Sequence, residues 1–232
     1  MISLKRIQTV LIKDYKDLMK NAYILSTVVL PILFAYMFGR GEEVPLAMTV
    51  IPIILAMVVV GSFVQAGMIA EEKEKNTLRG LLLSPLNTFE IFIGKSLLSF
   101  LLTVLMIVIV TLISQFEVPA NVLLFSLAVL VSTIFFIALG TILGLISRTV
   151  IETSVVGLPI MLIFGMGSLF RELFSSEVIL TILNYLPDGQ FLSLVVSLDN
   201  GGPVLEHFLV LGIWAFVAII VCVIIFKRRR FD

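Results

Sequence analysis

Residues 71–95 read EEKEKNTLRGLLLSPLNTFEIFIGK, and this charged stretch lies between two apolar segments at 46–70 and 91–114. Each flanking segment is about as long as the 20 or so helical residues that cross a bilayer. A leucine run, Leu81–Leu83, interrupts the polar residues, and exposed apolar side chains that cluster need a partner. The stretch therefore predicts two membrane helices joined by a polar connection with an apolar tip.

The composition of the whole chain is that of an integral membrane protein. Of its 232 residues, 59% are hydrophobic and 14% are charged, whereas soluble domains are about half apolar and a quarter charged. Apolar runs take up nearly all of the length, so no separate soluble catalytic domain is expected. We expect one all-α membrane domain over residues 1–232, with six transmembrane helices at about 22–38, 46–70, 91–114, 122–146, 151–170 and 204–226.

Residues 1–21 predict an amphipathic helix that lies in the membrane interface. Apolar residues recur there at intervals of three and four, which is the spacing of one helix face. Basic residues suit contact with an anionic lipid surface. The alternative is a plain cytosolic extension of the first span. The apolar set is Leu4, Ile7, Leu11, Tyr15, Leu18 and Ala22, and the basic set is Lys5, Arg6, Lys13, Lys16 and Lys20.

The distribution of basic residues predicts the orientation of the helices. Six spans place both chain ends on one side, and Lys and Arg in short loops accumulate on the cytoplasmic side. Fourteen of the sixteen basic residues fall on the side that holds both ends, and only Arg40 and Arg171 fall on the other. We therefore expect a multi-pass protein of a bacterial plasma membrane with both termini in the cytoplasm.

Two short apolar pieces, at 178–186 and 191–198, precede the last span. Each is too short to cross the bilayer, because nine helical residues reach only about 13 Å. Pro187, Asp188 and Gly189 separate the pieces, and Pro and Gly favour a turn. We expect an outer re-entrant hairpin at 178–198 that turns at these three residues. The alternative is an external loop with some apolar packing.

The sequence carries few residues suited to catalysis or to ion coupling. Glu206 and His207 are too few for a metal site, which usually needs three or four ligands. The IFIGKS sequence at 91–96 resembles the end of a phosphate-binding loop, but Phe89 stands where that loop needs a glycine. The spans have no carboxylate in the middle, where ion-driven carriers place their coupling groups. We expect no enzyme activity, no bound cofactor or metal, and an energy source outside the chain.

Gly140 and Gly144 form a small-xxx-small pair in the fourth span. Such a pair lets a second helix approach closely. We expect it to serve helix packing, and a specific dimer contact is the alternative.

The charged stretch predicts a helix-turn-helix elbow over residues 71–90. A helix that continues the second span through Leu83 is expected to end at the Ser-Pro pair that follows, because proline lacks the amide hydrogen and disfavours helix in the preceding residue. Asn87 and Glu90 have the spacing of a capping box that starts the next helix. The apolar tip at Leu81–Leu86 then either folds back on the membrane surface or docks on another protein.

This elbow resembles the hallmark segment of ABC-2 type permeases, the membrane subunits of ATP-binding-cassette exporters. The resemblance runs from the acidic-basic start through the leucine run and the Ser-Pro step to the hydrophobic-Gly-Lys exit. The layout of interfacial helix, six spans and outer hairpin is similar as well. The matching residues are Glu71, Glu72, Lys73, Glu74, Thr77, Leu78, Leu81, Leu82, Ser84, Pro85, Gly94 and Lys95.

The resemblance implies that the elbow is a coupling helix seated in a cleft of a separate ATPase subunit. ATP and Mg²⁺ would bind to the ATPase subunits, and two permease subunits, as a homodimer or a heterodimer, would enclose the path. The hairpin at 178–198 would close the outer end. The ATPase-coupling interface would comprise Glu71, Glu72, Lys73, Thr77, Leu78, Leu81, Leu82, Leu83, Ser84, Pro85 and Leu86.

These features predict an export permease that moves a drug-like, lipidic or amphipathic peptide substrate out of the cell. Its partners would be ABC ATPase subunits, a second permease subunit and the lipid bilayer, with no nucleic acid. The alternative is a non-transporting membrane sensor or immunity subunit that binds a membrane-active peptide.

Overall fold

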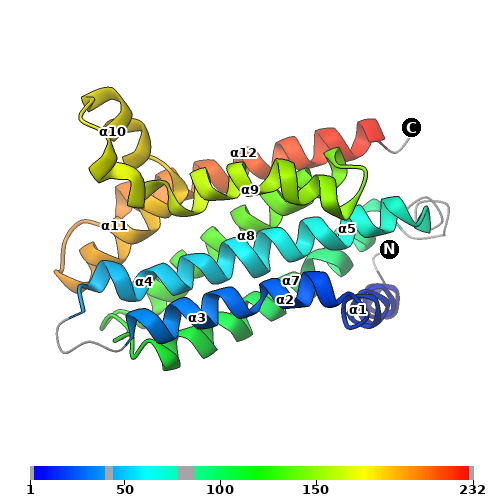
Figure 1. The fold of residues 1–232 in the computed structure, drawn as a ribbon, viewed down its shortest axis with the longest axis horizontal. Helices are drawn as coiled ribbons and strands as arrows, with labels where there is room; N and C mark the ends of the chain where they lie inside the picture. The colour runs from blue at the N-terminus through cyan, green and yellow to red at the C-terminus, as the bar shows by residue number, and fades with distance from the viewer. Residues whose placement is uncertain (1–2, 40–43, 78–86, 230–232) are drawn as a thin grey trace.

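The computed structural model describes residues 3–39, 44–77 and 87–229, and over these residues the chain is helical, with no strand. The long helices run along one axis (Figure 1). Both chain ends lie at the end of the bundle that holds α1 and the end of α5, whereas α10 lies at the opposite end (Figure 1). The elements are α1 (Leu4–Leu18), α2 (Ala22–Thr27), α3 (Val29–Phe38), α4 (Leu46–Leu55), the π-helical η1 (Ala56–Val64), α5 (Gln65–Glu74), α7 (Thr88–Ile113), α8 (Val122–Ile146), α9 (Val150–Met166), the 3-10 helix η2 (Gly167–Leu173), α10 (Glu177–Asn184), α11 (Pro187–Asp199) and α12 (Leu205–Arg229).

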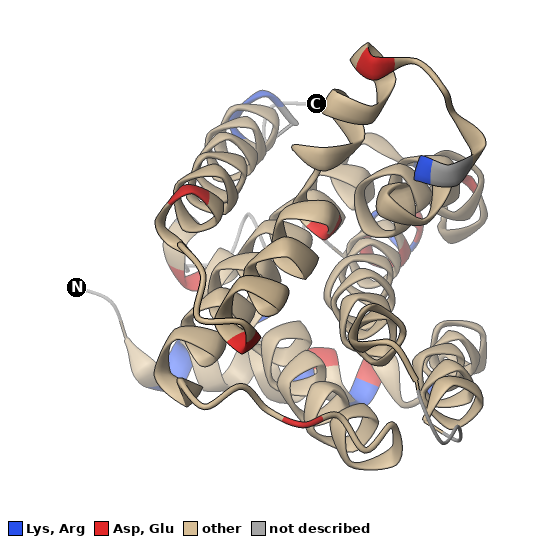
Figure 2. Ribbon diagram, turned by 90° about the vertical axis from the view of Figure 1, so that its left-hand side faces the viewer, with Lys and Arg blue, Asp and Glu red and all other residues tan. Residues whose placement is uncertain are grey.

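Within the described residues, five helical stretches are long and apolar enough to cross a membrane. Two bent helix pairs raise the number of candidate spans to as many as seven. One pair joins α1 to Ala22–Phe38 at 81°, and the other joins α10 to α11 at 73°. The six-span topology lies within this range and stays a prediction. Figure 2, which looks along the bundle from the α10 end, shows long stretches of helix without a charged residue.

The continuous helix formed by α4, η1 and α5 is the most buried candidate span of the bundle. The fourth-span glycine pair of α8 packs against it. A Cβ atom on Gly140 would lie 2.2 Å from the carbonyl oxygen of Ser62, and one on Gly144 would lie 2.7 Å from that of Ala66. α8 approaches η1 and α5 this closely because both positions lack a side chain. The pair thus packs helices of the same chain.

Helix α1 lies across the end of the bundle, but its buried face differs from the apolar face expected from the sequence. The side chains that face the protein are Ile7, Val10, Asp14 and Leu18. Leu4 is 82% exposed and Tyr15 is half exposed, although both were expected on one apolar face with Ile7 and Leu18. The face toward the protein therefore contains an aspartate, which apolar periodicity alone does not reveal.

The helix that continues the second span ends at Glu74, so the prediction that it extends to Leu83 is wrong. Lys75 follows as the C-cap, and Asn76 has a φ of 56°. Asn is one of the few residues other than Gly that adopts this left-handed conformation readily, and the conformation ends a helix. The leucine run and the Ser-Pro step at 78–86 lie outside the described residues.

The expected turn at Pro187, Asp188 and Gly189 is also wrong, because these residues form the first turn of α11. Proline is well suited to the first helical position, where its missing N–H would have no helical partner. The chain bends one step earlier, at Tyr185 and Leu186, between α10 and α11. The segment consists of two helices at an angle of 73° rather than an irregular loop. Whether these helices enter the membrane stays a prediction.

Candidate coupling site

The last turn of α5, residues Glu71–Glu74 (the α5 terminus), reaches several neighbouring helices. At one side, a carboxylate oxygen of Glu71 accepts a hydrogen bond of 2.7 Å from the side-chain amide of Asn21, the residue that caps α2. At the other, a carboxylate oxygen of Glu74 accepts a hydrogen bond of 3.3 Å from the backbone N–H of Val150, where α9 begins. The α5 terminus thus contacts the starts of two helices.

Glu72 joins α5 to α1 and α7 through ion pairs. One carboxylate oxygen pairs with Lys13 of α1 and the other with Lys95 of α7. Lys95 also lies 3.4 Å from Asp14, and Lys13 lies 3.3 Å from the same aspartate and 3.1 Å from Asp17. Asp14, Glu72 and Lys95 are each less than a tenth exposed. We call Lys13, Asp14, Glu72 and Lys95 the buried ion quartet.

Lys73 extends from the opposite side of the α5 terminus to the end of α8. Its ammonium donates hydrogen bonds to the carbonyl oxygen of Leu145, at 2.5 Å, and to that of Ser147. The last carbonyl groups of a helix lack intrahelical partners, and a cation is stabilising there. Lys73 therefore holds the end of α8 to the end of α5.

The quartet contains two positive and two negative side chains, so its core is electrically balanced. Burial acts to lower the pKa of Lys13, but its hydrogen bond to Glu72 and the nearby charges outweigh burial and raise the pKa. Burial raises the pKa of Asp14, and the charge of Lys95 opposes this effect. Lys13 is about a third exposed, but removing one of the three buried members, Asp14, Glu72 or Lys95, leaves an uncompensated buried charge, which costs about 3–5 kcal/mol.

The carboxylates of Asp14, Asp17 and Glu72 lie within 4.8 Å of one another, a spacing that a metal ion also requires. Lys13 already pairs with all three. The lysine ammonium supplies the positive charge of this cluster, and the geometry is that of an ion-pair network.

Close packing of α1 on α7 brings the quartet together. A Cβ atom on Gly94 would lie 2.8 Å from Cβ of Val10, so a side chain at this position would force α1 away from α7. At the start of α7, the carboxylate of Glu90 accepts the N–H groups of Asn87, at 2.8 Å, and of Ser3, at 2.7 Å. The first bond belongs to the expected capping box, which is present. The second fixes the beginning of α1.

The residues expected at the ATPase interface fall into two groups. Glu71, Glu72 and Lys73 make the internal contacts described above, and Thr77 lies exposed just beyond them, with its hydroxyl 3.3 Å from the carbonyl oxygen of Glu72. The other group, which comprises Leu78, Leu81, Leu82, Leu83, Ser84, Pro85 and Leu86, lies outside the described residues.

Sequence reasoning missed Asp14, and it counted Lys95 only toward the topology and the family resemblance. A signal for Asp14 exists, because it lies at helical spacing between Val10 and Leu18 on the buried face of α1. Lys95 follows Gly94 near the start of an apolar helix, where a buried lysine needs an acidic partner. Its partners come from segments far away in the sequence, and no local pattern identifies them.

A second feature is an apolar groove of about 590 Å³ between α2 and α3 on one side and η1 and α9 on the other, the α3–α9 groove. Leu33, Val58 and Leu162 represent its three walls. At one end the hydroxyls of Tyr23 and Ser154 are hydrogen-bonded at 2.8 Å. The groove is suited to an apolar or amphipathic occupant, because mostly apolar walls with few polar groups are typical of small-molecule sites.

The helical fold and the charged α5 terminus next to a connecting segment define a multi-pass membrane protein whose spans are tied together at one end. The chain belongs to the ABC-2 type transporter family, whose family model matches residues 5–170. It is therefore a permease subunit of an ABC transporter, from a family without an ATPase site of its own. Among curated proteins, none matches the chain.

Proposed function

We propose that this permease exports drug-like, lipidic or amphipathic peptide substrates, driven by ATP hydrolysis in separate ABC ATPase subunits. The ATPase contacts the connecting segment between α5 and α7, including Leu81–Leu86. The α5 terminus receives the movement of this segment and passes it to the spans. A second permease subunit completes the substrate path.

The observation that carries this proposal is the set of contacts made by the α5 terminus. Four consecutive side chains reach the starts of α2 and α9, the end of α8, and, through Glu72, the lysines of the quartet on α1 and α7. A structure that only closed a loop would not need each of these residues to contact a different helix. Displacement of the connecting segment at residues 78–86 reaches this turn through only three residues, Lys75, Asn76 and Thr77.

The path from the α5 terminus to the α3–α9 groove is short. α5 continues without a break into η1, which forms one wall of the groove. Glu74 contacts the start of α9, which forms another wall. A shift of the α5 terminus therefore changes two walls of the groove together. Its apolar lining supports an apolar or amphipathic substrate class.

Coexpression with an ABC ATPase encoded in a neighbouring reading frame tests this proposal. We expect the two proteins to copurify and the complex to hydrolyse ATP. Replacing both Leu82 and Leu83 by Asp should abolish copurification, while Leu173→Asp, a matched change at an exposed position of η2, should not. Undiminished copurification and ATP hydrolysis of the Leu82→Asp, Leu83→Asp variant would rule out the docking role.

A further inference from the structure

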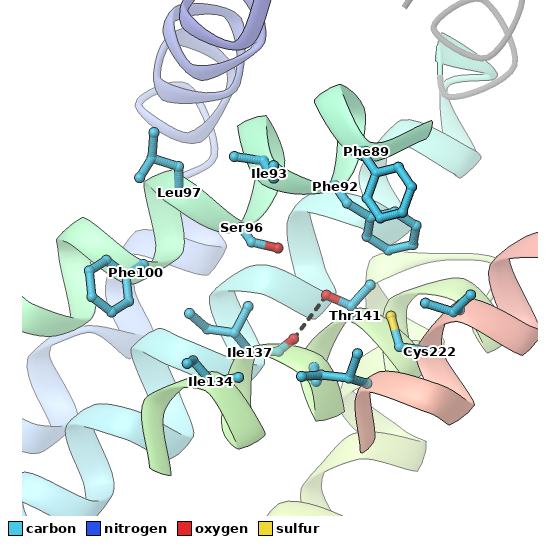
Figure 3. A pocket seen from close by; sticks show the side chains of 13 residues that line it. Phe89, Phe92, Ile93, Ser96, Leu97, Phe100, Ile134, Ile137, Thr141 and Cys222 are labelled. Atoms are coloured by element: carbon cyan, nitrogen blue, oxygen red, sulfur yellow. Dashed lines mark hydrogen bonds between the residues drawn. The ribbon is translucent and has the colours of Figure 1, made fainter. Parts of the chain in front are cut away.

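A second apolar groove, of about 390 Å³, lies between α7, α8 and α12, and shares no helix with the α3–α9 groove. Figure 3 shows its aromatic walls, with Phe89 and Phe92 at one end and Phe100 at the other. The hydroxyl of Thr141, one of the few polar groups of the lining, donates to the carbonyl of Ile137 at 2.9 Å (Figure 3). The walls of this α7–α12 groove are thus those of a hydrocarbon site.

The length and position of the α7–α12 groove match one leaflet of a bilayer. Phe89 and Phe100 are eleven helical residues apart, a rise of about 16 Å, and half of a bilayer's hydrocarbon core is about 15 Å thick. Phe89 belongs to the first turn of α7, so the groove begins at the end of a candidate span and stops near its middle.

Basic side chains occur where the groove reaches the end of the bundle. Lys227 follows Val223, which lines the groove, by four residues, and therefore lies on the same face of α12 one turn further on. Arg228 is the next residue, turned about 100° further around α12 from Lys227, and both are exposed. Phe226 fixes this end of α12 against α7, because its ring centroid lies 4.3 Å from that of Phe92.

Acidic side chains of the three helices do not oppose these cations. α8 contains no Asp or Glu, and the single acidic residue of α12, Glu206, lies in its first turn at the other end. In α7 the acidic residue is Glu90, which is fully buried and bound to Ser3, Asn87 and Arg6. The mouth of the groove therefore favours an anion.

We propose that the α7–α12 groove binds one acyl chain of an anionic phospholipid, whose phosphate is held by Lys227 and Arg228. An apolar slot one leaflet long that ends at two cations matches the two parts of such a lipid. Phosphate recognition by Arg and Lys and acyl burial along α7 reinforce one another. The lipid is a bound lipid and not the transported substrate, because its groove is separate from the proposed substrate groove.

Brominated lipids test this site in the full-length protein reconstituted in vesicles. The reporter is Phe100→Trp at the deep end of the groove, in a Trp214→Phe background that removes the native tryptophan. The vesicles consist of unlabelled phosphatidylcholine and a varied fraction of one brominated lipid. This lipid is either phosphatidylglycerol or phosphatidylcholine, each brominated in the acyl chain. We expect brominated phosphatidylglycerol to quench the reporter more strongly than brominated phosphatidylcholine does. The affinity for phosphatidylglycerol relative to phosphatidylcholine should fall roughly fivefold for each cation removed in Lys227→Gln and Arg228→Gln.

Two matched controls separate the site from general charge effects. Lys16→Gln with Lys20→Gln removes two exposed charges, one from α1 and one from the turn that follows it, at the same end of the bundle and should leave the preference intact. A reporter at Leu112, which is exposed near the other end of α7, should show no preference. Equal quenching by both lipids at Phe100→Trp, or no quenching because a second protein chain covers the groove, would overturn the proposal.

Native mass spectrometry of the unlabelled protein gives a second readout that needs no tryptophan exchange. The wild-type protein should retain phosphatidylglycerol in preference to phosphatidylcholine from an equal mixture, and the Lys227→Gln, Arg228→Gln variant should lose this preference. Identical retention in both proteins would contradict the phosphate site, independently of whether the permease transports any substrate.

Discussion

Asp14 of α1 and Lys95 of α7 lie 81 residues apart in the sequence, yet their charged atoms approach to 3.4 Å in the interior of the protein. Glu72 of α5 pairs with the same lysine. Helix α1, the helix that leads into the connecting segment and the helix that leaves it thus meet in one buried ion quartet. The proposed coupling role predicts that movement of the connecting segment changes the positions of these helices together.

The first prediction concerns the charge balance of the quartet. Lys95→Met should lower the free energy of unfolding by about 3–5 kcal/mol, because it leaves a buried carboxylate uncompensated. Asp14→Leu combined with Lys95→Met should be less destabilising than the sum of the two single changes, since Lys13 and Glu72 still balance. Unfolding in mixed detergent and dodecyl sulfate micelles measures each loss, and strictly additive losses would contradict the network.

The second prediction concerns the contact between α1 and α7. Gly94→Ala should destabilise the protein by about 1–3 kcal/mol, because the new methyl group overlaps the side chain of Val10. Val10→Ala in the same chain removes the overlapping Cγ1, which lies 2.9 Å from the added atom, but keeps Cβ, and should therefore restore part of the loss. The same unfolding measurement checks this rescue. If Val10→Ala lowers the free energy of unfolding of the Gly94→Ala protein by as much as it does in the wild-type protein, α1 does not pack against Gly94 of α7.

The third prediction compares two glycines in candidate spans. Gly140→Ala should cost several kcal/mol, because its Cβ would lie 2.2 Å from a backbone oxygen of η1 that has no freedom to rotate away. Gly212→Ala, in α12, is the matched control, since no atom lies within 4 Å of the added Cβ. It should be neutral or stabilising by up to about 1 kcal/mol. Equal effects of the two changes on unfolding would mean that α8 does not pack closely on η1.

The positions of the long helices could be predicted from the sequence because apolar runs leave few alternatives. α8 begins at Val122 and ends at Ile146, the bounds expected from its apolar run. In lipid every backbone group must be satisfied within the segment, so such a run forms a helix. The capping box of Asn87 and Glu90 was also predictable, because its two bonds are local.

Features that depend on tertiary contacts could not be predicted in the same way. Pro187 beside Asp188 and Gly189 favours a turn, yet proline also suits a helix start, and packing decides between the two. Asp14 pairs with Lys95, 81 residues away, and Lys13 pairs with Glu72, 59 residues away, and no periodicity reports such distant pairs. The early end of α5 depends on Asn76, whose left-handed conformation is open to asparagine without being required.

The measurement that tests the central claim most directly follows the α3–α9 groove while the ATPase works. In a Cys222→Ser chain, a bimane label on Leu162→Cys, which lines the groove, reports a change when ATP and vanadate trap the complex. Glu74→Leu removes the link between the α5 terminus and α9, the helix that carries the label, whereas Lys75→Met changes an exposed lysine that pairs with Glu71. The account predicts that the bimane response is lost in Glu74→Leu and kept in Lys75→Met, with ATP hydrolysis present in both. An undiminished response in Glu74→Leu would contradict it.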